Sequence, residues 1–178
     1  MMLFADTAGK DLYIGIFKNN KLHARIYVCD LVKKIEPMIF KFRQLLKEKN
    51  IKLEQIDSFY INIGPGSFTG SRSALILFKT IASVLKKDIY IGNTFDILKV
   101  LKTDNDIFLE ASKTQLFVWN RDTNKVSLVD KASNLITSTI DYELLEKNIK
   151  LITSNFKLIN SEEIIEPLYA KNPQIGGV

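Results

Sequence analysis

The residues best suited to chemistry in this 178-residue chain form a glycine-rich run, Gly64-Pro65-Gly66-Ser67-Phe68-Thr69-Gly70. Such a turn between a strand and a helix can hold a phosphate, because the first N–H groups of a helix lack partners within it. The glycine spacing is one residue longer than the dinucleotide fingerprint, and no Gly-Lys-Ser/Thr is present as in a P-loop. Both phosphate binding and a structural turn stay open, and the spacing favours the turn. Gly64 and Gly66 would then supply backbone conformations closed to other residues, and Gly70 close packing of the helix start.

Other common catalytic groups are scarce. The chain has one histidine, His23, and one cysteine, Cys29, and no nucleophile–base pair can be argued from them. The sequence lacks two histidines at helical spacing and a Gly-x-Ser-x-Gly motif, so it offers neither a familiar metal site nor a nucleophile–base pair. The residue types therefore favour a non-catalytic role and predict no metal site, and we do not expect peptidase activity.

The glycine run must be positioned by a strand before it, at Phe59–Ile63, and a helix after it, at Ala74–Leu85. Further apolar patterns predict the remaining elements of the first half. They are strands at 3–5, 12–17, 21–28 and 88–91, a hairpin turn at Asn19-Asn20, a helix capped by Asp30 and running to about Lys49, and a helix capped by Asn93 or Thr94 and running to about Lys102. Pro37 would bend the first helix or mark its regular start. The order reads βββαβαβα.

The second half repeats the beginning of the first. A shift of 104 residues places Ile107-Phe108 on Leu3-Phe4 and Glu110 on Asp6, without a gap. A helix near Tyr142–Lys147, a strand at Leu151–Thr153 and a polar tail from about residue 162 would complete a truncated copy. We therefore predict an α/β protein with a duplicated actin/Hsp70-like (RNase H-like) fold, with subdomains at 1–103 and 104–178.

The duplication would place Asp6 and Glu110 at the ends of equivalent strands, facing each other across a cleft. In active proteins of that architecture, carboxylates at these places hold a metal–nucleotide. The alternative is that each carboxylate begins a turn, as acidic residues often do.

Composition narrows the class of protein. The net charge is +5, but the lysines are scattered, which makes RNA binding as the main task a less favoured alternative. The apolar runs are shorter than a membrane span, and no signal peptide is evident. A single cysteine favours a reducing compartment, so we expect a cytoplasmic protein.

The helix at 73–87 has apolar residues around most of its circumference, more than one sheet face requires. The surplus must be covered by the first helix or by another protein, and the sequence leaves both open.

The segment Gly64–Arg72 resembles the signature of the bacterial TsaB/YeaZ family, which serves tRNA threonylcarbamoyladenosine synthesis. Weaker resemblances lie elsewhere along the chain. They are Asp6-Thr7-Ala8, the helix segment Ile35–Ile39, the turn Gly92–Phe95 and the ending Glu166–Pro173.

The resemblance implies a cytoplasmic, actin-like scaffold that works with a catalytic paralogue, TsaD, and an ATPase, TsaE. Together these add threonylcarbamoyl to N6 of adenosine 37 in tRNAs that read codons beginning with A. ATP and metal are then expected on TsaD and no cofactor on this chain, although weak nucleotide binding in a vestigial cleft of Asp6, Thr7 and Glu110 stays open. Contact with tRNA would be indirect, and self-pairing in isolation also stays open. A free-standing ATPase or kinase and a small RNA-binding module are the alternatives.

The family pairs through its two N-terminal helices, here about 31–46 and 71–85. Carried over, the expected partner interface consists of Leu31, Ile35, Met38, Phe40, Phe42, Arg72, Leu75, Phe78, Lys79 and Ala82.

Overall fold

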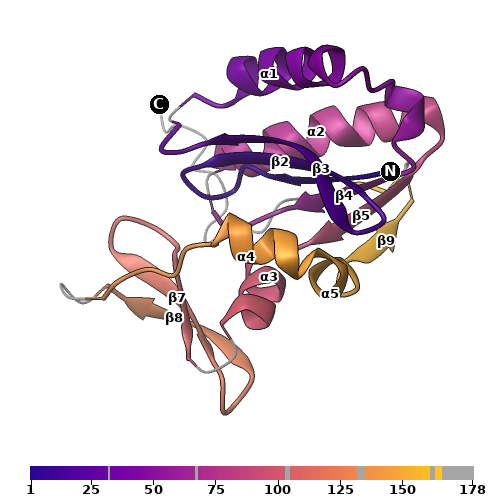
Figure 1. Ribbon diagram of the computed structural model, residues 1–178. Coiled ribbons are helices and arrows are strands. Elements are labelled where there is room, and N and C mark those ends of the chain that lie inside the picture. Colours follow the sequence, from indigo (N-terminus) through magenta and orange to yellow (C-terminus); the bar gives the residue numbers. More distant parts are fainter. Residues whose placement is uncertain (32, 67, 103–104, 132–134, 161–162, 166–178) are drawn as a thin grey trace.

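Two β-sheets and two layers of helices make up the protein (Figure 1). The computed structural model describes residues 1–31, 33–66, 68–102, 105–131, 135–160 and 163–165. The larger sheet has the strand order β3-β2-β1-β4-β5-β9, and the smaller sheet has the order β6-β7-β8. The α/β class predicted from the sequence is confirmed. The resemblance in residues 166–173 and most of the predicted polar tail lie outside the described residues.

The larger sheet is mixed. Its strands are β1 (Met2–Asp6), β2 (Leu12–Lys18), β3 (Lys21–Val28), β4 (Ser58–Asn62), β5 (Asp88–Gly92) and β9 (Lys157–Ile159). β1, β4 and β5 are parallel neighbours, while β2 is antiparallel to β1 and β9 is antiparallel to β5. The β2–β3 turn is the predicted two-residue hairpin, with φ of 52° at Asn19 and 60° at Asn20, a conformation that asparagine tolerates better than most residues.

Helices cover both faces of this sheet. α1 (Ile35–Glu48) and α2 (Phe68–Leu85) lie on one face, and α3 (Thr94–Leu101), α4 (Tyr142–Lys147) and α5 (Ile149–Thr153) lie on the other (Figure 1). A short 3₁₀ helix, η1 (Leu53–Gln55), precedes β4. The predicted cap of α3 is confirmed, since the Asn93 side chain accepts a hydrogen bond from the Asp96 N–H at 3.0 Å.

The start of α1 differs from the prediction. Asp30 does not cap the helix but has φ of 50° in the turn after β3, and α1 begins at Ile35. Pro37 lies in the first turn, where its missing N–H would have had no partner in the helix. Pro37 thus marks the regular start of the helix.

The core has a separate layer on each face of the larger sheet. Under α1 and α2, Phe42 meets Phe78 edge to face at 5.2 Å between ring centroids, and Phe59 lies 6.2 Å from Phe78. On the opposite face, Phe4 and Phe17 pack with Tyr142 and Phe156. These two layers fix where the carboxyl ends of the parallel strands lie.

The second half begins like the first. β6 (Ile107–Glu110), β7 (Gln115–Asn120) and β8 (Lys125–Asp130) form an antiparallel meander, as β1, β2 and β3 do. The register differs by one residue, because Asp6 pairs with Tyr13 whereas Glu110 pairs with Leu116 rather than Phe117. The two halves therefore repeat the order of their strands more than the sheet faces to which corresponding side chains point.

The rest of the second half departs from the predicted copy. The helix at Tyr142–Lys147 is confirmed, but the strand predicted at Leu151–Thr153 is wrong, because Ile149–Thr153 is α5. Ile149 and Ile152 are spaced by one helical turn and both bury their side chains in the second core layer. β9 then joins the larger sheet beside β5. The division after residue 103 stays a prediction, with α4, α5 and β9 packed on the first unit.

Among the helices that the structure describes, none combines the length and apolar character needed to cross a membrane.

Candidate functional site

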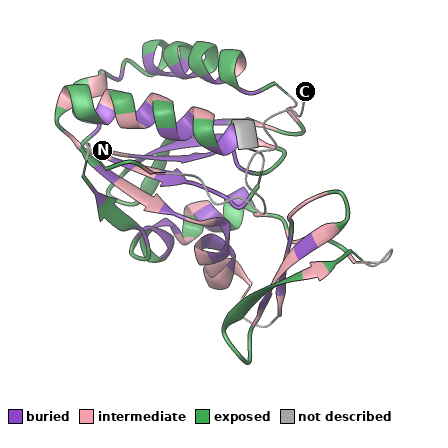
Figure 2. Ribbon diagram, turned by 180° about the vertical axis from the view of Figure 1, so that it is seen from behind, coloured by how far each residue is buried: buried purple, intermediate pink, exposed green. Residues whose placement is uncertain are grey.

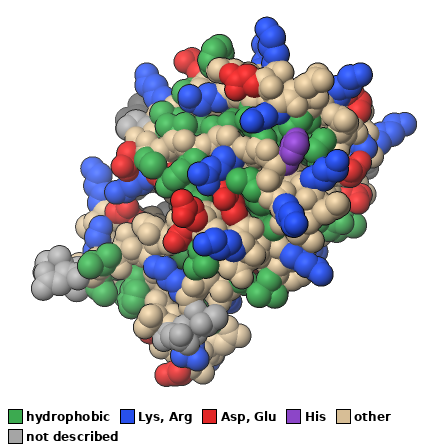
Figure 3. Space-filling model, in the orientation of Figure 1, with side chains coloured by type: hydrophobic (Ala, Val, Ile, Leu, Met, Phe, Trp, Pro, Cys, Tyr) green, Lys and Arg blue, Asp and Glu red, His purple; other side chains and the backbone are tan. Residues whose placement is uncertain are grey.

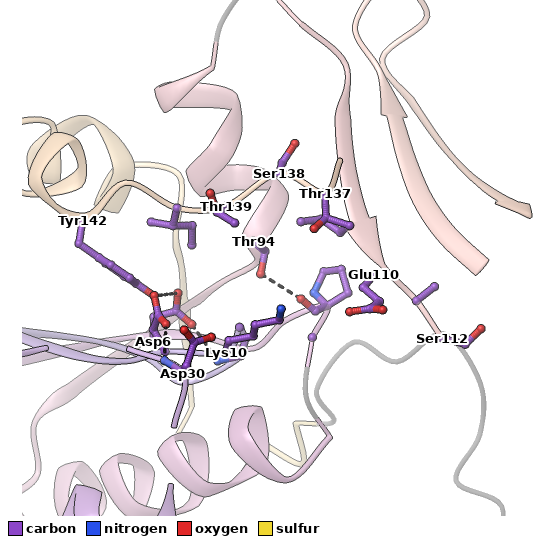
Figure 4. A pocket seen from close by; sticks show the side chains of 18 of the residues that line it. Asp6, Lys10, Asp30, Thr94, Glu110, Ser112, Thr137, Ser138, Thr139 and Tyr142 are labelled. Atoms are coloured by element: carbon purple, nitrogen blue, oxygen red, sulfur yellow. Dashed lines mark hydrogen bonds between the residues drawn. The ribbon is translucent and has the colours of Figure 1, made fainter. Parts of the chain in front are cut away.

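A cavity of about 610 Å³ lies where the carboxyl ends of the larger sheet face the smaller sheet (Figure 4). Asp6 at the end of β1 and Glu110 at the end of β6 both line it. Figure 4 shows Asp6, Asp30 and Tyr142 on one side and Glu110 on the other. Ligands of α/β proteins commonly bind at the carboxyl ends of parallel strands, so this cavity, called the cleft below, is one candidate site.

Asp6 is a buried carboxylate, with 1% of its surface exposed. Its Oδ1 accepts a hydrogen bond from the Ala8 N–H at 2.8 Å, and its Oδ2 accepts one from the Tyr142 hydroxyl at 3.0 Å. Burial raises the pKa of the Asp6 carboxyl above its usual value, and these hydrogen bonds and the charge of Lys34 offset part of that rise. The Tyr142 contact joins α4 to the end of β1.

Lys34 acts electrostatically on Asp6 and is not among the site residues predicted from the sequence. Its ammonium donates to the Thr7 carbonyl at 3.0 Å and to the Gly9 carbonyl, so it ties the loop after β1 to the start of α1. Burial lowers the pKa of this ammonium. No signal in the sequence separates Lys34 from its exposed neighbour Lys33, because both precede the helix in the same basic pair.

The other two predicted cleft residues have different surroundings. Thr7 is buried and does not line the cavity, because its hydroxyl turns to α2 and donates to the Gly70 carbonyl at 2.6 Å. Its assignment to a nucleotide cleft is thereby corrected. Glu110 is exposed and forms an ion pair of 3.1 Å with Lys131.

The glycine run has the backbone roles of a structural turn. Gly64 has φ of 99°, which strongly favours glycine. Gly66 does not have a positive φ, so the prediction that it supplies a backbone conformation closed to other residues is wrong. A Cβ there would lie 2.6 Å from the Ala8 carbonyl carbon, so Gly66 is required by the close approach of two loops.

Side-chain hydrogen bonds from β4 and α3 stabilise this turn. The Asn62 side chain accepts from the Gly64 N–H at 3.0 Å and donates to the Thr94 hydroxyl at 3.1 Å. Thr94 in turn donates to the Pro65 carbonyl at 3.2 Å (Figure 4). Gly70 is buried at the start of α2, as its predicted packing role requires.

The second candidate site is the outer surface of α1 and α2. Five large apolar side chains are substantially exposed there: Ile35 (45%), Ile39 (40%), Phe40 (69%), Ile76 (63%) and Val84 (76%). Figure 2 shows α2 with its buried side against the sheet and its exposed side outward. We call these five residues the helix patch.

Half of the predicted interface does not lie on this surface. Five of its residues are less than 5% exposed and belong to the core: Met38, Phe42, Leu75, Phe78 and Ala82. They lie on the sides of α1 and α2 that pack into the core above the larger sheet, so their assignment as partner contacts is corrected. Ile35 and Phe40 are exposed, Arg72 is exposed, and Leu31 and Lys79 are half-buried, the latter donating to the Glu163 carbonyl.

Ile39, Ile76 and Val84 were not among the interface residues predicted from the sequence. A signal was present for α2, because Arg72, Ile76, Thr80 and Val84 are each four residues apart, and a stripe with two polar members is the natural outer side.

Within the described residues, no three or more His, Cys, Asp or Glu side chains are grouped so that they could hold a metal ion.

Comparison with known proteins assigns the family. The family model described as TsaD, tRNA N6-adenosine threonylcarbamoyltransferase, matches residues 30–139, more than half of the chain. The protein MG208 of Mycoplasma genitalium is 27% identical over 192 residues, which cover 96% of this chain and 95% of that protein. The tRNA threonylcarbamoyladenosine biosynthesis protein TsaB of Buchnera aphidicola is 23% identical over 165 residues, covering 85% and 73%.

Among solved structures, YeaZ from Pseudomonas aeruginosa superposes with a TM-score of 0.58 at 16% identity, over 80% of this chain and 73% of that chain. This similarity confirms the predicted actin-like, RNase H-like fold. The chain therefore belongs to the family described as TsaD, tRNA N6-adenosine threonylcarbamoyltransferase, and it is similar to the TsaB and YeaZ proteins.

Proposed function

We propose that this chain is a non-catalytic scaffold subunit in the synthesis of threonylcarbamoyladenosine at adenosine 37 of tRNA. It pairs with a catalytic paralogue of the TsaD type through α1 and α2. The observation that carries this proposal is the helix patch, in which five exposed apolar side chains lie on two neighbouring helices.

The helix patch has the composition of an interface core. Fully burying a Phe or Ile side chain contributes about 1.5–3 kcal/mol, so removing even part of the patch from water would favour association substantially. Phe40, with 69% exposure, is the largest available side chain on α1, and aromatic residues often dominate binding energy. Exposed Lys41 and Arg43 on the same helix would suit an acidic rim on the partner.

The residue types support the assignment of the catalytic chemistry to a different subunit. The only histidine of the sequence, His23, is exposed on β3 at the edge of the larger sheet and does not line the cleft; it is the purple side chain in Figure 3. Metal, ATP and the acyl transfer itself are accordingly assigned to the TsaD-type partner, and a TsaE-type ATPase completes the complex in the cytoplasm. Basic side chains in Figure 3 are scattered among apolar and acidic ones on the visible face, which suits indirect contact with tRNA.

The pairing is tested by substituting the helix patch. Phe40→Asp and Ile76→Asp each place a charge at an exposed position, so folding should be retained while affinity for a purified TsaD-type partner falls at least about tenfold. Leu151→Asp on α5 is the matched control, since Leu151 is 58% exposed and lies on the opposite face of the sheet. Normal pairing by both patch variants would contradict the proposed interface.

The role in modification is tested in cells. Deletion of the gene should remove threonylcarbamoyladenosine from tRNA nucleosides measured by mass spectrometry. The wild-type chain and Leu151→Asp should restore it, whereas Phe40→Asp should not. An unchanged nucleoside level after deletion would contradict the proposed function.

A further inference from the structure

The cleft has a chemical character that the scaffold role does not use. Hydroxyl groups contribute much of its polar lining, from Thr94, Ser112, Thr137, Ser138, Thr139 and Tyr142. Apolar atoms of Leu109 and Ile140 complete the wall between them. Its volume of about 610 Å³ is within the usual range of pockets for small molecules.

The ionisable groups around the cleft are mainly acidic. Four carboxylates line it against two ammonium groups: Asp6, Asp11, Asp30 and Glu110 against Lys10 and Lys113. Lys34 does not reverse this balance, because its ammonium is occupied by the Thr7 and Gly9 carbonyls. Lys131 does not reverse it either, because its ion pair with Glu110 leaves three other carboxylates against Lys10 and Lys113. A ligand in the cleft therefore meets an excess of negative charge.

A metal–nucleotide, which the actin-like architecture implies, does not fit this lining. The acidic groups of the cleft are not arranged as a metal site in the described part of the chain. Without a cation between them, phosphate groups would be repelled by the carboxylates. The glycine turn gives little room, because the Ala8 backbone closes directly on Gly66.

The same lining suits a ligand that donates hydrogen bonds. Carboxylate oxygens only accept, and the Asp30 carboxylate has no hydrogen-bond or ion-pair partner among the described residues. Asp30 and Asp6 lie on one side of the cleft and Glu110 on the other, so one ligand could donate to both walls (Figure 4).

We propose that the cleft binds a phosphate-free small molecule of neutral or positive charge that is rich in hydroxyl and amino groups, and that it discriminates against nucleoside triphosphates. Such a ligand would bridge the larger sheet and the smaller sheet. This inference is separate from pairing through the helix patch, and either can fail without the other.

The test compares adenosine, AMP and ATP–Mg²⁺, which share a base and a ribose and differ in phosphate. Calorimetric titration of the full chain at low ionic strength should give measurable binding of adenosine, with ATP–Mg²⁺ weaker by about tenfold or more. AMP should lie between them. Binding of ATP–Mg²⁺ as tight as that of adenosine would overturn the proposal, and so would the absence of adenosine binding up to millimolar concentrations.

Variants connect the discrimination to the cleft. Asp30→Asn with Glu110→Gln should weaken adenosine binding and reduce the discrimination between adenosine and ATP–Mg²⁺. Asp122→Asn, an exposed position in the β7–β8 turn, is the matched control and should change neither. Circular dichroism of all variants separates loss of binding from loss of folding. Unchanged binding in the double variant would overturn the assignment to the cleft.

Discussion

Replacing Phe78 by alanine would measure how strongly α2 is held by its own sheet. The Phe78 side chain is completely buried, and its ring meets Phe42 at 5.2 Å and Phe59 at 6.2 Å. Truncation of a buried phenylalanine to alanine costs about 3–5 kcal/mol, through lost burial and the cavity left behind. That loss is a large part of the total stability of a domain, which is about 5–15 kcal/mol.

The measurement is urea unfolding followed by circular dichroism, with Ile76→Ala on the same helix as the control. Ile76 is 63% exposed, so its truncation should change the free energy of unfolding by no more than about 0.5 kcal/mol. For a chain of this size, the Phe78→Ala loss corresponds to a fall in melting temperature of about 6–20 °C. A Phe78→Ala protein within about 1 kcal/mol of the wild type would refute the orientation of α2 described above.

Substitutions at three further positions test the cleft and the elements around it. Asp6→Asn removes a carboxyl whose pKa is raised in the folded protein. The free energy of unfolding of the wild type therefore falls as pH rises above the ordinary pKa of 3.8, and the variant lacks that loss. Urea titrations at several pH values should show the difference in the free energy of unfolding widening in favour of the variant. Gly66→Ala forces a Cβ against the Ala8 backbone and should lower the free energy of unfolding by about 1–3 kcal/mol, visible as a lower urea midpoint. Asn93→Ala removes the α3 cap and should cost about 1 kcal/mol in the same assay, whereas Asn93→Asp should cost less.

Local patterns in the sequence determined most of the larger sheet and its helices. Alternating apolar residues placed β1 to β5, and the Asn19-Asn20 turn and the Asn93 cap were correct because each depends on backbone preferences within a few residues. The strand predicted at Leu151–Thr153 failed because a segment of three residues with two apolar ones is compatible with either a strand or a short helix. Packing of Ile149 and Ile152 on the sheet decides for the helix.

For the candidate sites too, the sequence determined some features and the tertiary structure determined the others. The sequence by itself marked Asp6 and Glu110 as strand ends and the glycine run as a turn, and the structure brings both carboxylates to one cleft. Only the tertiary structure decided that Phe78 faces the sheet while Ile76 faces outward, since α2 is apolar on nearly all sides and the two polar residues of its outer stripe, Arg72 and Thr80, are a weak signal of its rotation. It also decided that Lys34 is buried and hydrogen-bonded to the loop after β1, and that β9 joins the larger sheet. Such contacts join residues far apart in the chain, so no local sequence pattern indicates them.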